Sequence, residues 1–368
     1  MADKNQFLKS QYSASLQEAV LECQSLRMDS TNPQDITLAQ YVRARWGVSM
    51  EEFYQDLGIN PSVDTISNLV NLPDKSARWL IPEIYRDALR LGYRRSPIYP
   101  NLIAATQNVQ GLEITQPHFN MSDAEALYTG IAESIRLGNV SFGQKSVKLR
   151  KVARGIAVPY EVNNFVAMNV VGLFLQDFGI KLGHQKDMLA LHTLINGDQV
   201  DGSESAAVIG VATANTLVYK DILKPYARGS RLGRNFTTQV SGEDFAIDML
   251  DLDEYSKRES GTPAKGLNIK TPIPQSSDLY IHSGVPEDQL LMVDPGLAMI
   301  EYNAQALLVE AEKIVSNQTE ATYASLITGF GIAYRDARII LDKSIAFADN
   351  GFPTWMDPSN QEQSVFKK

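Results

Sequence analysis

The sequence predicts an α+β fold arranged around one long helix. Residues 159–198 place apolar side chains mostly three or four positions apart, which is the spacing of a helix face. Strand-like segments precede this stretch, between about 110 and 158, and further apolar runs follow it. The chain has 368 residues, 44% of them hydrophobic, which is enough for a large buried core and for two or more subdomains.

The predicted long helix has recognisable ends. Pro159 stands where proline is tolerated in a first turn, and Asn196-Gly197 supplies the left-handed stop expected just after a helix. Gly172, Gly179 and Gly183 each weaken the helix relative to alanine. We therefore expect bending, or close packing against another backbone, at these glycines.

The residues before this helix predict shorter helices. Residues 1–27 show the seam of an amphipathic helix, and packing on its own domain is favoured over an extended coiled coil. Residues 37–57 predict two short helices that meet at Gly47. A DNA-binding helix-turn-helix is disfavoured there, because the second helix is acidic where phosphate contacts need basic residues. Residues 81–90 predict one more helix.

Residues 110–158 predict strands around a loop, and the return leg is unusually basic. Lysine and arginine occupy five positions of this leg within a protein of net charge −9: Lys145, Lys148, Arg150, Lys151 and Arg154. A solvated strand face is the common explanation of such a run. A long charged hairpin buries little of its own surface, however, so we expect it to find support on another surface.

The residues after the long helix alternate between helix and strand signals. Residues 241–255 predict a helix with one acidic side, after a stretch of mixed character, and residues 257–274 predict an exposed loop. Residues 279–282 and 290–293 read as strands, and three apolar runs follow between 307 and 341.

Composition excludes several classes of protein. A net charge of −9 argues against non-specific attraction of the whole chain to nucleic acid or to an anionic membrane. The single cysteine, Cys23, excludes an intramolecular disulfide and a multi-cysteine zinc site. No apolar run reaches membrane-spanning length, and the first residues lack the hydrophobic core of a signal peptide. We expect a soluble protein made in the cytoplasm.

Motifs that carry chemistry are missing from the sequence. His184 and His192 are eight residues apart on the predicted helix, too far for one zinc ion without a bend. Asp251 and Asp253 would face different directions on a helix. Residues 229–234 look superficially like a phosphate loop, but lone glycines beside basic residues are common in loops. We expect no cofactor, metal or catalytic residue, although a site assembled across the fold would be invisible at this level.

The order of elements resembles the tailed-phage major capsid proteins, whose fold is shared by encapsulin shells and by the capsid floor of herpesviruses. Three features carry the resemblance: the basic hairpin, the Val158-Pro159-Tyr160-Glu161 entry into a helix that ends at Asp198, and the closing patterns at 307–312 and 326–341. The resemblance covers roughly residues 78 to 345.

The resemblance implies a division of the chain. It comprises a helical extension, internal to the shell or scaffold-like (1–77), an N-terminal arm (78–108), an extended hairpin loop (109–158), a peripheral domain with the spine helix (159–198 and 306–345), an axial domain (199–305) and a C-terminal tail (346–368). It also implies a structural protein and not an enzyme. Pentamers and hexamers would build an icosahedral shell around double-stranded DNA in a virion, with scaffolding, portal and decoration proteins as partners and no membrane.

Our hypothesis for the basic residues combines both lines of reasoning. Lys145, Lys148, Arg150, Lys151 and Arg154 would lie near acidic groups of a neighbouring subunit. Two other functions stay open at this point. One is an encapsulin-type shell that holds a peptide-marked cargo, and the other is a soluble enzyme with a dispersed active site.

Overall fold

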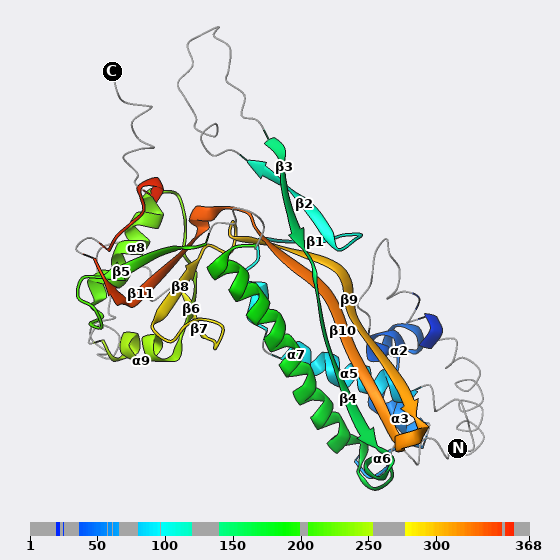
Figure 1. Ribbon diagram of the computed structural model, residues 1–368. Coiled ribbons are helices and arrows are strands. Elements are labelled where there is room, and N and C mark those ends of the chain that lie inside the picture. The colour runs from blue at the N-terminus through cyan, green and yellow to red at the C-terminus, as the bar shows by residue number, and fades with distance from the viewer. Residues whose placement is uncertain are drawn as a thin grey trace, which may run out of the picture. The chain divides into compact units, whose positions relative to one another are not determined.

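The computed structural model has the mixed helix and strand content that the sequence predicts. It describes residues 20–22, 25, 37–56, 58–60, 62–65, 80–95, 97–119, 140–198, 205–252, 277–347 and 350–356. The predicted loop at 257–274 and most of the predicted helix at 1–27 lie outside these residues. The chain forms two compact units: unit 1 contains residues 1–97, 151–185 and 305–327, and unit 2 contains residues 98–150, 186–304 and 328–368 (Figure 1).

The short helices of unit 1 confirm the sequence prediction. Helix α2 (Leu38–Trp46) and helix α3 (Met50–Asp56) meet at Gly47, which adopts the left-handed conformation with φ +71°. The ring of Trp46 stacks on that of Phe53 with 5.7 Å between centroids. Helix α5 (Leu80–Tyr93) covers the helix predicted at 81–90.

The predicted long helix is interrupted near its start, so the prediction of one continuous helix was wrong. Helix α6 (Tyr160–Phe165) ends at Val166, whose backbone is extended, and helix α7 (Met168–Asn196) begins two residues later. At the break, Ala167 forms a β-bridge with Thr65, and the amide of Met168 donates to the carbonyl of Asp64. The predicted stop is confirmed, because Gly197 follows α7 with φ +86°.

Helices α5 and α7 pack at backbone distance in unit 1. A Cβ atom added at Gly179 would lie 2.1 Å from the carbonyl oxygen of Leu89, and one added at Gly183 would lie 3.1 Å from that of Tyr93. The expected close packing is therefore confirmed at these two glycines. It is absent at Gly172, where an added Cβ would meet nothing within 4 Å.

A sheet with the strand order β1-β9-β10-β4 contributes to the core of unit 1. Its strands are β1 (Ala105–Asn108), β9 (Met299–Ile314), β10 (Thr319–Ile332) and β4 (Arg150–Pro159). Side chains of β10, such as Ala324 and Leu326, pack against Val171, Leu175 and Phe178 of α7. Helices α2, α3 and α5 add to the same cluster, which forms the core of the unit.

Unit 2 is built on a mixed five-stranded sheet. Its order is β5-β11-β8-β6-β7, and the strands are β5 (Ala207–Val211), β11 (Arg338–Ala346), β8 (Gln289–Val293), β6 (Thr238–Ser241) and β7 (Asp278–Ile281). Strand β11 runs parallel to β5 and antiparallel to β8. The strands predicted at 279–282 and 290–293 and the apolar runs after 307 are confirmed.

The sheet of unit 2 is buried on both faces, which explains its continuous apolar runs. Along β8, Leu290 and Met292 belong to one core cluster, whereas Leu291 and Val293 belong to the other. Successive side chains of a strand point to opposite faces, so each cluster covers one side. The last turns of α7 fill the second cluster through Leu191 and neighbouring residues.

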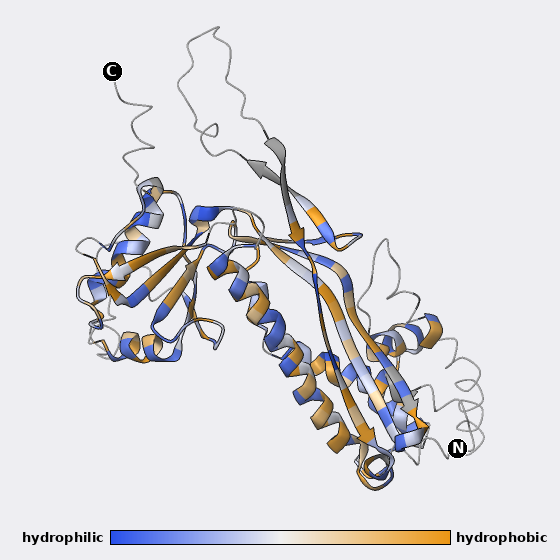
Figure 2. Cartoon of the chain, in the orientation of Figure 1, coloured by the Kyte–Doolittle hydropathy of each residue, from blue (hydrophilic) through white to orange (hydrophobic). Residues whose placement is uncertain are grey.

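Helices α8 (Tyr219–Arg231) and α9 (Glu243–Asp251) cover the first face of this sheet. The sequence analysis missed α8, because it took the stretch before 241 as mixed and 229–234 as a loop. Helix α9 ends at Asp251, before the predicted end near Tyr255. Figure 2 shows that both helices alternate apolar and polar residues, as expected for helices with one buried face.

A buried ion pair lies in unit 2. The ammonium of Lys186 donates to the carboxylate of Glu301, and both side chains are almost wholly shielded from solvent. The same ammonium lies 4.0 Å from the ring centroid of Tyr99. Next to it, Asp187 accepts hydrogen bonds from the amides of Ile98 and Tyr99 at 3.1 and 2.9 Å.

Candidate assembly surface

The basic segment begins on a two-stranded hairpin. Strand β2 (Glu113–Phe119) pairs antiparallel with β3 (Val140–Lys148), and Glu113 lies directly opposite Lys148. Opposite charges at such a position stabilise a strand pair modestly. At the end of the hairpin away from its loop, the amide of Leu149 donates a hydrogen bond to the carbonyl of Leu112 over 2.9 Å.

The five basic residues do not share one return leg, as the sequence analysis expected. Lys145 and Lys148 lie on β3, but this strand ends at Lys148, and Arg150, Lys151 and Arg154 lie on β4. Arg150 and the hairpin belong to unit 2, whereas Lys151 and Arg154 belong to unit 1. Leu149 is buried and separates the two groups. A buried apolar residue between two strands is the signal that could have predicted this division.

Arg154 makes a contact within its own unit. Alternation along β4 places Arg154 on the same side as Val152 and Ile156, which pack against the core of unit 1. Its guanidinium group accordingly lies 5.8 Å from the ring centroid of Phe178 on α7. Lys151 points to the opposite side and is exposed. Arg154 is also exposed, as are Lys148 and Arg150.

The first turns of α7 expose a second surface, which the sequence analysis treated as helix core. Leu173 and Phe174 are 63% and 61% exposed, and Val170 is also exposed. The buried residues Val171 and Leu175 lie on the opposite side of the helix. Figure 2 shows mostly apolar residues on the visible side of this part of α7. A helix with apolar residues on every side is expected to be buried on more than one face. In a single chain, the face of α7 that carries Leu173 and Phe174 is not covered.

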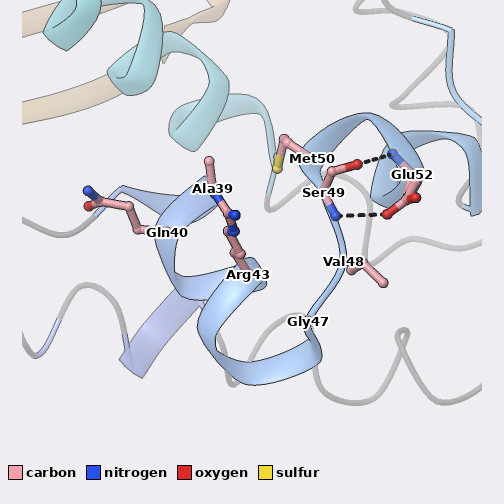
Figure 3. Close-up of a pocket in the computed structure, with 8 residues that line it drawn as sticks. All are labelled: Ala39, Gln40, Arg43, Gly47, Val48, Ser49, Met50 and Glu52. Atoms are coloured by element: carbon pink, nitrogen blue, oxygen red, sulfur yellow. Dashed lines mark hydrogen bonds between the residues drawn. The ribbon is translucent and has the colours of Figure 1, made fainter.

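A cavity of about 530 Å³ lies between α2 and α3 (Figure 3). Its lining consists of Ala39, Gln40, Arg43, Gly47, Val48, Ser49, Met50 and Glu52. The polar groups of Ser49 and Glu52 bind each other: each backbone amide donates to the other side chain, over 3.0 and 3.2 Å. The hydrogen bond from the Ser49 amide lowers the pKa of Glu52. These groups cap the start of α3 and do not form an acid–base pair for catalysis.

Other candidate sites give no sign of chemistry in the described residues. His184 and His192 are exposed on α7. Within the described ranges, no three His, Cys, Asp or Glu side chains are grouped so as to hold a metal ion. Of the helices that the structure describes, none has the length and apolar character to cross a membrane.

Comparison with known proteins identifies the fold. No protein-family model matches this sequence, and no curated protein does. The capsid of a native GTA particle is similar with a TM-score of 0.50 at 14% identity, over 69% of this chain and 91% of that chain. A virus-like particle from Pyrococcus furiosus has a TM-score of 0.49 at 10% identity, over 70% and 97% of the two chains. An encapsulin complex from Synechococcus elongatus has a TM-score of 0.47 at 12% identity, over 67% of this chain and 88% of that chain.

The element order agrees with this similarity. A strand hairpin, a long helix, four strands of the five-stranded sheet with two helices, the two long strands β9 and β10, and the last sheet strand β11 follow one another along the chain. The chain therefore has the capsid fold of the tailed-phage major capsid proteins and encapsulin shells, as its sequence resemblance implied.

Proposed function

We propose that this chain is the major capsid protein of a tailed phage. Its copies assemble as pentamers and hexamers into an icosahedral shell that encloses double-stranded DNA. The observation that carries the proposal is the fold, which matches the capsid of a GTA particle over 91% of that chain's length. The protein would then be a structural component of the virion and not an enzyme, with scaffolding, portal and decoration proteins as partners.

The surfaces of the single chain support a role in self-association. The hairpin carries exposed Lys148, and α7 exposes Leu173 and Phe174. Contiguous exposed apolar side chains commonly mark protein interfaces. We also propose that Lys148 and Arg150, together with Lys145, contact acidic groups of a neighbouring subunit. One exposed ion pair is worth only about 0–1 kcal/mol, so the contact matters through repetition over the shell.

The division of the chain follows from the same proposal. Residues 78–108 would form the N-terminal arm, residues 109–158 the extended loop, and residues 199–305 the axial domain at the centre of each ring. Residues 159–198 and 306–345 would form the peripheral domain. The segment 1–77 would be a helical extension that is internal to the shell or scaffold-like.

Light scattering and negative-stain microscopy of the purified protein test the proposal. We expect closed particles, or rings of five or six subunits. Particles isolated from the natural source should protect double-stranded DNA from nuclease. Shells that instead hold one defined protein would indicate an encapsulin-type cargo shell. A monomer that stays unassembled with scaffolding and portal proteins, and that binds a small molecule saturably, would indicate an enzyme.

A further inference from the structure

Helices α8 and α9 of unit 2 carry stripes of opposite charge. On α8, the basic residues Lys220, Lys224, Arg228 and Arg231 follow one another at spacings of four, four and three. This spacing aligns them along one side of the helix. Lys220 and Arg231 at its two ends are exposed, and the side that packs on the sheet contains Ile222 and other buried residues instead.

The stripe on α9 is acidic. Asp244, Asp248 and Asp251 are spaced by four and three, and all three are exposed. Helix α9 contains no lysine or arginine, but Asp248 is paired with Lys343 of β11, so the net negative charge of the outer side rests on Asp244 and Asp251. Its buried side contains Phe245 and Met249, which pack into the core of unit 2.

Apolar residues accompany both stripes. On α9, Ile247 and Leu250 are 57% and 51% exposed beside the aspartates. On α8, the half-buried Leu223 and the exposed Ala227 lie next to the basic stripe. Ala227 has a small side chain, so this part of α8 leaves room for a larger apolar side chain of a partner. The two helices are thus complementary in charge and in the size of their apolar residues.

The positions of the two helices favour a partner outside the chain. Both pack on one face of the sheet of unit 2, and Figure 1 shows them at opposite ends of that unit. A contact of α8 with α8, or of α9 with α9, would place like charges together, which costs several kcal/mol when repeated across an interface, a loss of about 100-fold or more in association. The charges therefore select a contact of α8 with α9 over a contact of either helix with its own copy. A two-fold pair and a head-to-tail ring both allow such a contact, and the proposed shell function requires the ring.

We propose that the basic side of α8 on one copy binds the acidic and apolar outer side of α9 on the next copy. A head-to-tail contact of this kind generates a ring when the rotation between copies closes. The inference rests on the proposed shell function and deepens it, because it assigns one contact that joins subunits within a pentamer or hexamer.

Charge reversal on one helix at a time tests the contact. The variant K220E/R231E removes the net positive charge of the α8 stripe, in which Lys224 and Arg228 remain. The variant D244K/D251K removes the net negative charge of α9, in which Glu243 and Asp248 remain. We expect each variant alone to lose ring formation, with an association constant lower by about 100-fold or more. Asp248 is left unchanged because it binds Lys343 within the chain.

Mixing and combining these variants gives a sharper test. A 1:1 mixture should assemble with copies of the two variants in alternation, which permits rings of six but not of five. The combined variant, with all four substitutions, restores opposite charges at the exchanged positions and should regain both ring sizes. As a matched control, R43E/E51K reverses two exposed charges on α2 and α3 of unit 1 and should assemble like the unmodified protein.

A disulfide experiment locates the contact directly. In a C23S background, A227C/I247C should give a ladder of covalent oligomers on oxidation, up to five or six copies. Neither single-cysteine variant should form the ladder. The inferred contact between α8 and α9 is refuted if the unmodified protein and both charge variants form rings and no ladder appears. The proposed function then stands. If the unmodified protein forms neither rings nor shells with its partners, the proposed function fails, and the inference fails with it.

Discussion

Replacing Gly179 with alanine should destabilise unit 1, although alanine favours helices. The added Cβ would lie 2.1 Å from the carbonyl oxygen of Leu89 and 2.9 Å from the amide nitrogen of Tyr93. Both atoms belong to the backbone of α5, so rotation of a side chain cannot relieve the clash. Overpacking lowers the free energy of unfolding by up to about 3 kcal/mol, whereas the higher helix propensity of alanine raises it by about 1 kcal/mol. The net loss of stability is about 2 kcal/mol.

The matched control is Gly172→Ala in the same helix. An added Cβ there meets nothing within 4 Å, so only the propensity gain of about 1 kcal/mol applies. The two variants should therefore differ by about 3 kcal/mol in the free energy of unfolding. Urea titration of the unassembled protein, followed by circular dichroism, measures this difference.

The outcome decides whether α5 and α7 are in backbone contact. If G179A and G172A unfold at the same urea concentration, the close approach at Gly179 does not exist and the packing described for unit 1 is wrong. If G179A unfolds early but still forms shells, the contact serves stability and is not required for assembly.

Three further predictions concern stability and assembly. Lys186→Met should cost about 3–5 kcal/mol because Glu301 keeps the hydrogen bond from Thr106 but stays buried without its cation, and adding Glu301→Leu should recover most of that loss in the same urea titration. Thr37→Ala should cost about 1 kcal/mol, seen as a lower thermal midpoint, because it removes the hydroxyl that caps α2. Lys148→Glu with Arg150→Glu should impair shell assembly, seen by light scattering, while the monomer keeps its circular dichroism; normal shells would refute the proposed contact.

The spine of the fold could be predicted from the sequence, but its interruption could not. Apolar spacing located α7, and Asn196-Gly197 located its end. The break between α6 and α7 depends on Thr65 and Asp64, which lie about a hundred residues earlier in the chain and bind Ala167 and Met168. Hydrogen bonds between distant segments leave no trace in local periodicity, so the pattern continued across the break.

Helix α8 was missed for a different reason. Pro225 lies inside it and Gly229 near its end, and both residues normally argue against a helix. Proline removes one backbone hydrogen bond, yet here Ile222 and Tyr226 pack into the core of unit 2 on the same helix. Burial of these side chains outweighs the lost hydrogen bond, and this compensation depends on the sheet that they contact.

The apolar residues of α7 fall into two groups, one that packs within the chain and one that stays exposed. On α7, the buried residues Val171, Leu175 and Phe178 follow one stripe at spacings of four and three, which suffices for packing in unit 1. Leu173 and Phe174 are equally apolar but add nothing to that core, and they are exposed. Large apolar side chains on the exposed side of a helix lower the solubility of the monomer and do not add to its stability. Exposed apolar residues at such positions are expected in a subunit whose outer surface is covered by other copies, as in the proposed shell.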